Sequence, residues 1–65
     1  MPKEAHNTAA EHHENAAKSH RSAAEAHGRG DHAKGMEHST QAQNSSKSAR
    51  EKSDMAHSKS QTAKG

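Results

Sequence analysis

The chain has 65 residues, which limits it to one small domain. Only 25% of the residues are hydrophobic, and these are alanines and three methionines, because valine, isoleucine, leucine, cysteine and all aromatic residues are absent. This composition excludes a conventional apolar core, a disulfide and a thiolate metal site. The formal net charge is +2, from 10 basic and 8 acidic residues, and the 8 histidines add positive charge below about pH 6.5.

Strong hydrophilicity is the second general feature. The mean hydropathy is −1.52, which is typical of a disordered or conditionally helical chain that gains structure from a partner, a metal, drying or self-association. The start of the chain lacks the apolar stretch of a secretory signal, and no apolar run is long enough to cross a bilayer. We therefore expect a soluble, cytoplasmic protein with no membrane partner.

A seven-residue period predicts a first helix over about residues 4–27. Histidines and two series of alanines recur in step, and positions spaced by three, four and seven residues share one face of a helix. The spacing of Thr8 and Glu11 is typical of a capping box, so the helix begins near residue 4 or residue 8. The histidines of the stripe are His6, His13, His20 and His27, and the opposite face carries Glu11, Glu14, Lys18, Arg21 and Glu25.

A turn is predicted over residues 28–31, which read Gly28-Arg29-Gly30-Asp31. Glycine supplies the left-handed residue that stops a helix, and Asp31 is suited to cap the next one. The segment is therefore the best candidate for a hairpin turn between two helices.

A second helix is predicted over about residues 32–57, again with a seven-residue period. Its serine series is Ser39, Ser46, Ser53 and Ser60, and its small-residue series is Gly35, Ala42, Ala49, Ala56 and Ala63. The run Asn44-Ser45-Ser46 has low helix propensity, which predicts a break near residues 44–47. The tail over residues 58–65 is expected to fray.

Together these elements predict an all-α fold, an antiparallel helical hairpin in which residues 1–65 form one small unit. Facing residue numbers that total about 59 would place His20 near Ser39, His13 near Ser46 and His6 near Ser53. The same register would place Ala17 near Ala42 and Ala10 near Ala49. Because alanine buries little area, we expect the isolated monomer to be marginal or disordered, with a homo-oligomer or a partner helix supplying further order.

The histidines suggest binding of copper, nickel, cobalt or zinc. Seven residues of helix rise about 10.5 Å, so successive stripe histidines cannot share one ion within one helix. Metal would then bind between chains or locally at the turn, and the alternative is adventitious affinity of solvated histidines. The candidate ligands are His6, His13, His20, His27, Asp31 and His32.

Other function classes have weaker support. No nucleophile elbow or oxyanion-hole motif accompanies the serines and histidines, so we do not expect an enzyme. The sequence pI is about 9.2, yet no aromatic residue is present for base stacking, and nucleic acid is expected to make weak phosphate contacts at most. The basic side chains of the second half are Lys47, Arg50, Lys52, Lys59 and Lys64.

The run AAEHHENAAKSHRSAAEAHGRGDHAKG, from Ala9 to Gly35, resembles the repeats of small bacterial proteins rich in His, Ala and Glu. The composition of the whole chain is also similar to hydrophilins and helical late-embryogenesis-abundant proteins, which are polar and become helical on drying. The chain differs from the latter in its histidine content and in its seven-residue period, where many of those proteins use eleven.

These patterns support three functional hypotheses. The first is a non-catalytic, stress-protective, hydrophilin-like helical protein. The second is a histidine-based metal-binding or buffering protein that gives metal tolerance. The third is a structural partner helix within an assembly.

Overall fold

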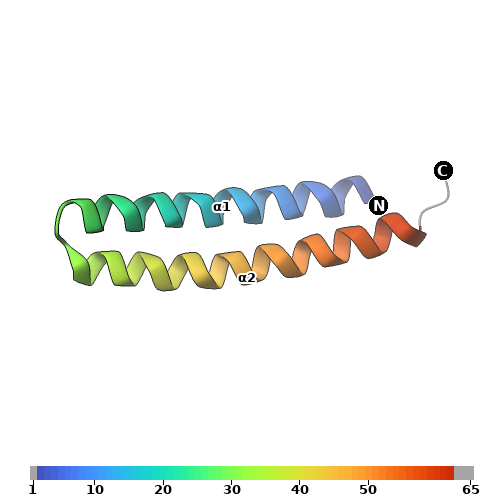
Figure 1. The fold of residues 1–65 in the computed structure, drawn as a ribbon. Helices are drawn as coiled ribbons and strands as arrows, with labels where there is room; N and C mark the ends of the chain where they lie inside the picture. The colour runs from blue at the N-terminus through green and yellow to red at the C-terminus, as the bar shows by residue number, and fades with distance from the viewer. Residues whose placement is uncertain (1, 63–65) are drawn as a thin grey trace.

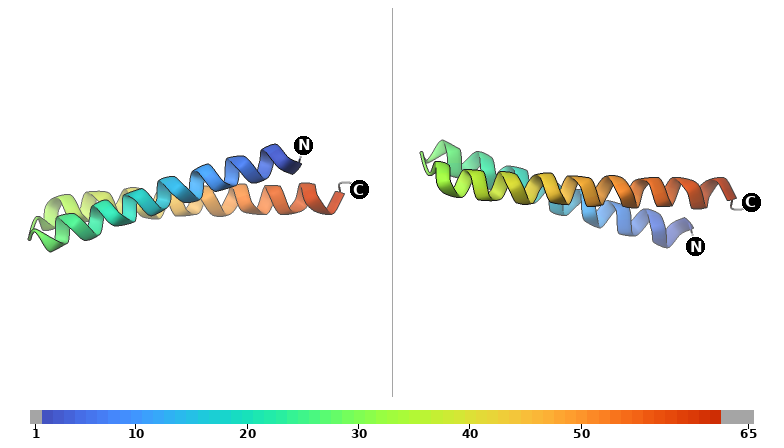
Figure 2. Two further views of the ribbon diagram at one scale, coloured as in Figure 1. Left: turned by 90° about the horizontal axis from the view of Figure 1, so that it is seen from above. Right: turned by 90° about the horizontal axis from the view of Figure 1, so that it is seen from below.

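Two long helices make up the structure, a computed structural model that describes residues 2–62. Helix α1 spans Pro2–Gly28 and helix α2 spans His32–Thr62 (Figure 1). They pack side by side and antiparallel, and the hairpin measures 52 × 13 × 10 Å. The views in Figure 2 show a shallow crossing, with the start of α1 and the end of α2 at the end opposite the turn. The prediction of an all-α antiparallel helical hairpin is confirmed.

Helix α1 begins earlier than the capping-box spacing indicated. Pro2 is its first residue, and proline suits that position because its fixed φ is already helical. Glu4 lies in the first turn, where a negative charge interacts favourably with the helix dipole. Thr8 and Glu11 therefore lie inside the helix, and the prediction that they cap it is wrong.

The turn ends α1 with a left-handed glycine at Gly30, whose φ is +79°. The Gly30 amide donates to the His27 carbonyl at 3.0 Å, and the Asp31 amide donates to the Ala26 carbonyl at 2.9 Å. This pair of bonds is the Schellman arrangement, which satisfies carbonyls left free at a helix end. Asp31 caps the start of the next helix, because its Oδ1 accepts a hydrogen bond from the Lys34 amide at 3.1 Å, as predicted.

Helix α2 runs without interruption through residues 44–47, so the predicted break is wrong. Ser45 and Ser46 are half-buried against α1, and packing against a partner helix outweighs their low helix propensity. The helix also continues past residue 57 to Thr62, so fraying from residue 58 is wrong for residues 58–62. The remainder of the predicted tail, residues 63–65, lies outside the described residues.

The contact between the helices, hereafter the seam, consists of residues no larger than alanine. Within residues 2–62, every buried position is alanine or glycine. Ala10 is exposed and therefore lies outside this contact, whereas Ala49, which was predicted to face it, is fully covered. The seam is formed by Ala9, Ala16, Ala23 and Ala26 of α1 and by Gly35, Ala42, Ala49 and Ala56 of α2.

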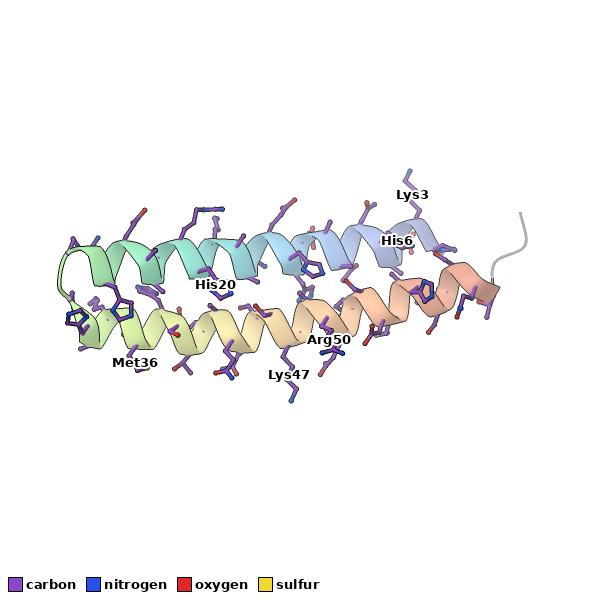
Figure 3. All side chains as sticks on the ribbon, in the orientation of Figure 1. Lys3, His6, His20, Met36, Lys47 and Arg50 are labelled. Atoms are coloured by element: carbon purple, nitrogen blue, oxygen red, sulfur yellow. The ribbon has the colours of Figure 1, made fainter. Side chains whose placement is uncertain are left out.

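The outer faces are polar. The charged residues predicted for the outer face of α1, Glu11, Glu14, Lys18, Arg21 and Glu25, are all exposed. Figure 3 shows Lys3, Met36 and Lys47 pointing away from the partner helix, whereas His20 points toward it. Within the part of the chain that the structure describes, neither helix offers an apolar segment long enough to span a bilayer.

Candidate functional site

Three histidines of α1 each share a hydrogen bond with a serine of α2. His6 Nε2 lies 2.7 Å from Ser60 Oγ, His13 Nε2 lies 2.7 Å from Ser53 Oγ, and His20 Nε2 lies 3.3 Å from Ser46 Oγ. We call these three pairs the ladder. The ladder joins the helices along most of their length.

The ladder corrects the predicted register. Histidine does face serine, but the paired residue numbers total 66, so each histidine meets the serine one heptad farther from the turn than expected. Side chains of a helix lean toward its N-terminus. An α1 imidazole therefore reaches away from the turn, past the α2 residue at its own level. The prediction paired each histidine with the serine whose backbone faces it across the hairpin, which gave Ser53, Ser46 and Ser39, and it did not consider the direction of the side chains.

The ladder histidines do not form a metal centre within one hairpin. Their rings follow one another at one heptad, which is about 10.5 Å of helix rise, whereas metal–nitrogen bonds are about 2 Å long. Each of these rings is exposed and already contacts a serine hydroxyl. A serine oxygen accepts a bond from either a neutral or a charged imidazole, so these contacts are compatible with both states.

The fourth stripe histidine behaves differently. In the ladder register His27 would meet Ser39, but its Nδ1 instead lies 3.0 Å from Nδ1 of His32, the first residue of α2. The two ring centroids are 5.3 Å apart and the ring planes are inclined by 37°. We call His27 and His32 the turn pair. One of the two nitrogens must accept the shared proton, so at least one ring of the pair is neutral in this contact.

Gly35 explains why His27 leaves the ladder. It occupies the heptad position that alanine occupies at Ala42, Ala49 and Ala56. A Cβ built on Gly35 would lie 2.5 Å from His27 Nε2 and 2.6 Å from its Cε1, closer than real contacts allow. The ring of His27 therefore occupies the space that an alanine methyl would fill.

Of the six ligands predicted from the sequence, the structure brings two together, His27 and His32. Asp31 lies between the helices, where one of its carboxylate oxygens caps α2. Residues 2–62 contain no group of three or more His, Asp or Glu side chains arranged to hold one ion. Among the six predicted ligands, His27 and His32 are therefore the pair whose ring nitrogens lie close together, at 3.0 Å.

Two shallow grooves are lined by residues of both helices. One is polar and is lined by His12, Asn15, Asn44, Ser45 and Ser48. The other is lined by Ala5, Thr8, Lys52, Met55 and Lys59. Sequence reasoning did not identify either groove, because each combines residues from both helices and depends on the register.

Comparisons with protein-family models, with curated proteins and with solved structures found no match to this chain.

Proposed function

We propose that this chain is a non-catalytic, stress-protective helical protein of the hydrophilin kind, whose hairpin orders as water is withdrawn. One observation carries the proposal: within residues 2–62, no side chain larger than alanine is buried. The stability of a hairpin with such a seam depends strongly on the solvent, because few other interactions offset the conformational entropy of the unfolded chain.

The energetics of the seam support this dependence on conditions. A buried methyl group contributes about 0.8 kcal/mol, whereas ordering one residue costs about 1–2 kcal/mol of backbone entropy. Drying and excluded solutes strengthen burial and favour the compact state. The hairpin is therefore expected to be marginal in dilute buffer and to become more ordered during water loss.

The surface supports a shielding role. Charged and amide side chains cover the outer faces, and the two large exposed apolar residues, Met36 and Met55, lie 64% and 50% exposed on different turns of α2. A surface of this kind remains hydrated and stays dispersed among other proteins. The groove that contains His12, Ser45 and Ser48 has no hydrogen bond between the imidazole and either serine among the described residues, so no base activates a nucleophile there, which favours a non-catalytic role.

A drying assay tests the proposal. A labile reporter enzyme is dried and rehydrated with the wild-type chain, with Ala23→Lys in the seam, or with Ala24→Lys at the exposed neighbouring position. We expect the wild type and Ala24→Lys to preserve activity, and Ala23→Lys to protect less because its helices cannot close. Protection by the wild type no better than that of an inert protein of equal mass would contradict the proposal.

A second candidate function, metal buffering, is favoured by the 3.0 Å approach of the two Nδ1 atoms in the turn pair. The ligands of this function would be His27 and His32, while the ladder histidines stay with their serines. Calorimetry against a chain of the same composition in scrambled order tests it. Equal affinity for copper, nickel, cobalt and zinc in both chains would remove metal buffering and leave the protective function untouched.

A further inference from the structure

We propose that the turn pair is a two-histidine copper(II) site, in which Nδ1 of His27 and Nδ1 of His32 bind one ion and fasten the turn of the hairpin. The site stands apart from the protective function, because a chain that binds no metal could still protect. It specifies which ion and which residues the metal-buffering candidate would use.

The two nitrogens lie close enough together for one ion to bind both. With metal–nitrogen bonds of about 2.0–2.1 Å, ligands at right angles lie about 2.9 Å apart, and tetrahedral ligands lie about 3.3 Å apart. The observed separation is 3.0 Å. A separation of 3.0 Å is also the length of the hydrogen bond in the metal-free pair, so the distance admits a bridging ion without selecting one. Copper(II) is the candidate because it binds nitrogen most strongly among first-row divalent ions and accepts adjacent ligands at right angles.

Both rings can bind a metal through Nδ1 when that nitrogen carries no proton. Neutral imidazole binds a metal through either nitrogen, and a ring that binds through Nδ1 carries its proton on Nε2. In the metal-free pair one Nδ1 carries the shared proton. Where both rings are neutral, binding of copper moves that proton to Nε2 of the same ring and releases no net proton; where one ring is charged, binding releases one proton to solvent.

The backbone of α2 prepares the site through Gly35. Because Gly35 has no Cβ, the ring of His27 lies over the helix and within reach of His32. An alanine at this position would push the ring away without altering either ligand. Gly35 is therefore a positioning residue for the site.

The turn pair is accessible and leaves room for other ligands. Both histidines are exposed, and no third His, Asp or Glu in the described part of the chain completes a closed cage. Water would fill the remaining positions of the ion, which is typical of an exchangeable site. Since His27 lies in the last turn of α1 and His32 is the first residue of α2, binding favours the closed hairpin over the open chain.

Titration of the full chain with copper(II) ion, read by calorimetry and by electron paramagnetic resonance, tests the proposal. We expect one tight site per chain with a tetragonal spectrum and coupling to two imidazole nitrogens. His32→Ala removes a ligand and Gly35→Ala displaces one, so each should weaken this site by at least about tenfold and reduce the number of coupled nitrogens.

Two matched variants serve as controls. His38→Ala removes a histidine of α2 outside the turn pair, and Gly28→Ala adds a methyl group where no atom lies within 4 Å. Both should retain the wild-type affinity, and circular dichroism should show that all four variants remain helical. Retention of the tight site in His32→Ala or Gly35→Ala, or one ion bound per two chains, would overturn the proposal.

Discussion

The ladder and the turn pair use histidines of the same heptad series in different ways. His6, His13 and His20 each reach a serine of α2, whereas His27 turns to another histidine although Ser39 lies in register with it. The difference begins at one residue, because Gly35 stands where the other heptads have alanine. The absence of a methyl group at Gly35 thus lets His27 pair with His32 and not with a serine.

The largest effect is expected from a substitution that separates the two helices and so disrupts both the ladder and the turn pair. Ala23→Lys places a long charged side chain in the seam, which costs at least about 3 kcal/mol through overpacking and burial of charge. The helices should separate, and helicity measured by circular dichroism should fall sharply. Ala24→Lys, at the exposed neighbouring residue of the same helix, has the same composition and should leave helicity nearly unchanged. Equal losses in the two variants would show that the helices do not pack through this seam.

The turn that separates the two regions is the next most sensitive feature. Gly30→Ala forces an L-residue into the left-handed conformation and should cost about 1–2 kcal/mol in thermal unfolding. Gly28→Ala serves as the control, since Gly28 is helical and its added methyl group meets no neighbour. If the two variants unfolded alike, the left-handed stop at Gly30 would not be what ends α1.

Gly35→Ala should convert the turn pair into a fourth rung of the ladder. The new methyl group displaces the His27 ring toward Ser39, while alanine raises helix propensity by about 1 kcal/mol relative to glycine. We expect a slightly higher unfolding temperature together with loss of the His27–His32 contact. Nuclear magnetic resonance of the ring nitrogens distinguishes the two arrangements. An unchanged signal from His32 would contradict the role assigned to Gly35.

Removing one rung of the ladder should have a smaller effect. Ser53→Ala deletes the partner of His13, and the bond is expected to contribute about 0.5–1 kcal/mol. Ser58→Ala, an exposed position of the same helix, gains the same helix propensity without losing a rung. The difference between the two unfolding free energies isolates the bond. No difference would mean that the ladder follows helix packing and adds nothing to it.

Mild acid should have the smallest effect on the ladder. A protonated imidazole still donates to serine, and rings one heptad apart, about 10.5 Å, lie at the limit of electrostatic screening in physiological salt. Helicity measured between about pH 7 and pH 5 should therefore change little. A cooperative loss of helicity over this range would show that the ladder bonds require neutral histidines.

The sequence predicted the hairpin because its evidence was local. The heptad period, the glycines of the turn and Asp31 as a cap each depend on residues close together in the chain, and they identified the two helices and the turn. Boundaries were less accurate. The predicted break near Ser46 was wrong because a contact across the seam, the ladder bond to His20, adds to the order of that segment.

The register and the turn pair depended on information that local patterns do not contain. A seven-residue period allows several registers that differ by one heptad, and the lean of side chains along α1 decides among them. The signal for the turn pair was present at Gly35, a glycine in an otherwise alanine series. The role of Gly35 could not be predicted from the sequence, because it depends on where the His27 ring lies in the packed hairpin.

The measurement that tests the central claim most directly is circular dichroism of the wild-type chain across a series of an excluded osmolyte such as trimethylamine N-oxide. The claim is that a seam of alanine and glycine makes the hairpin depend on its solvent. We predict that helicity rises with osmolyte in the wild type and in Ala24→Lys, and much less in Ala23→Lys. Helicity of the wild type that is independent of osmolyte would contradict the account.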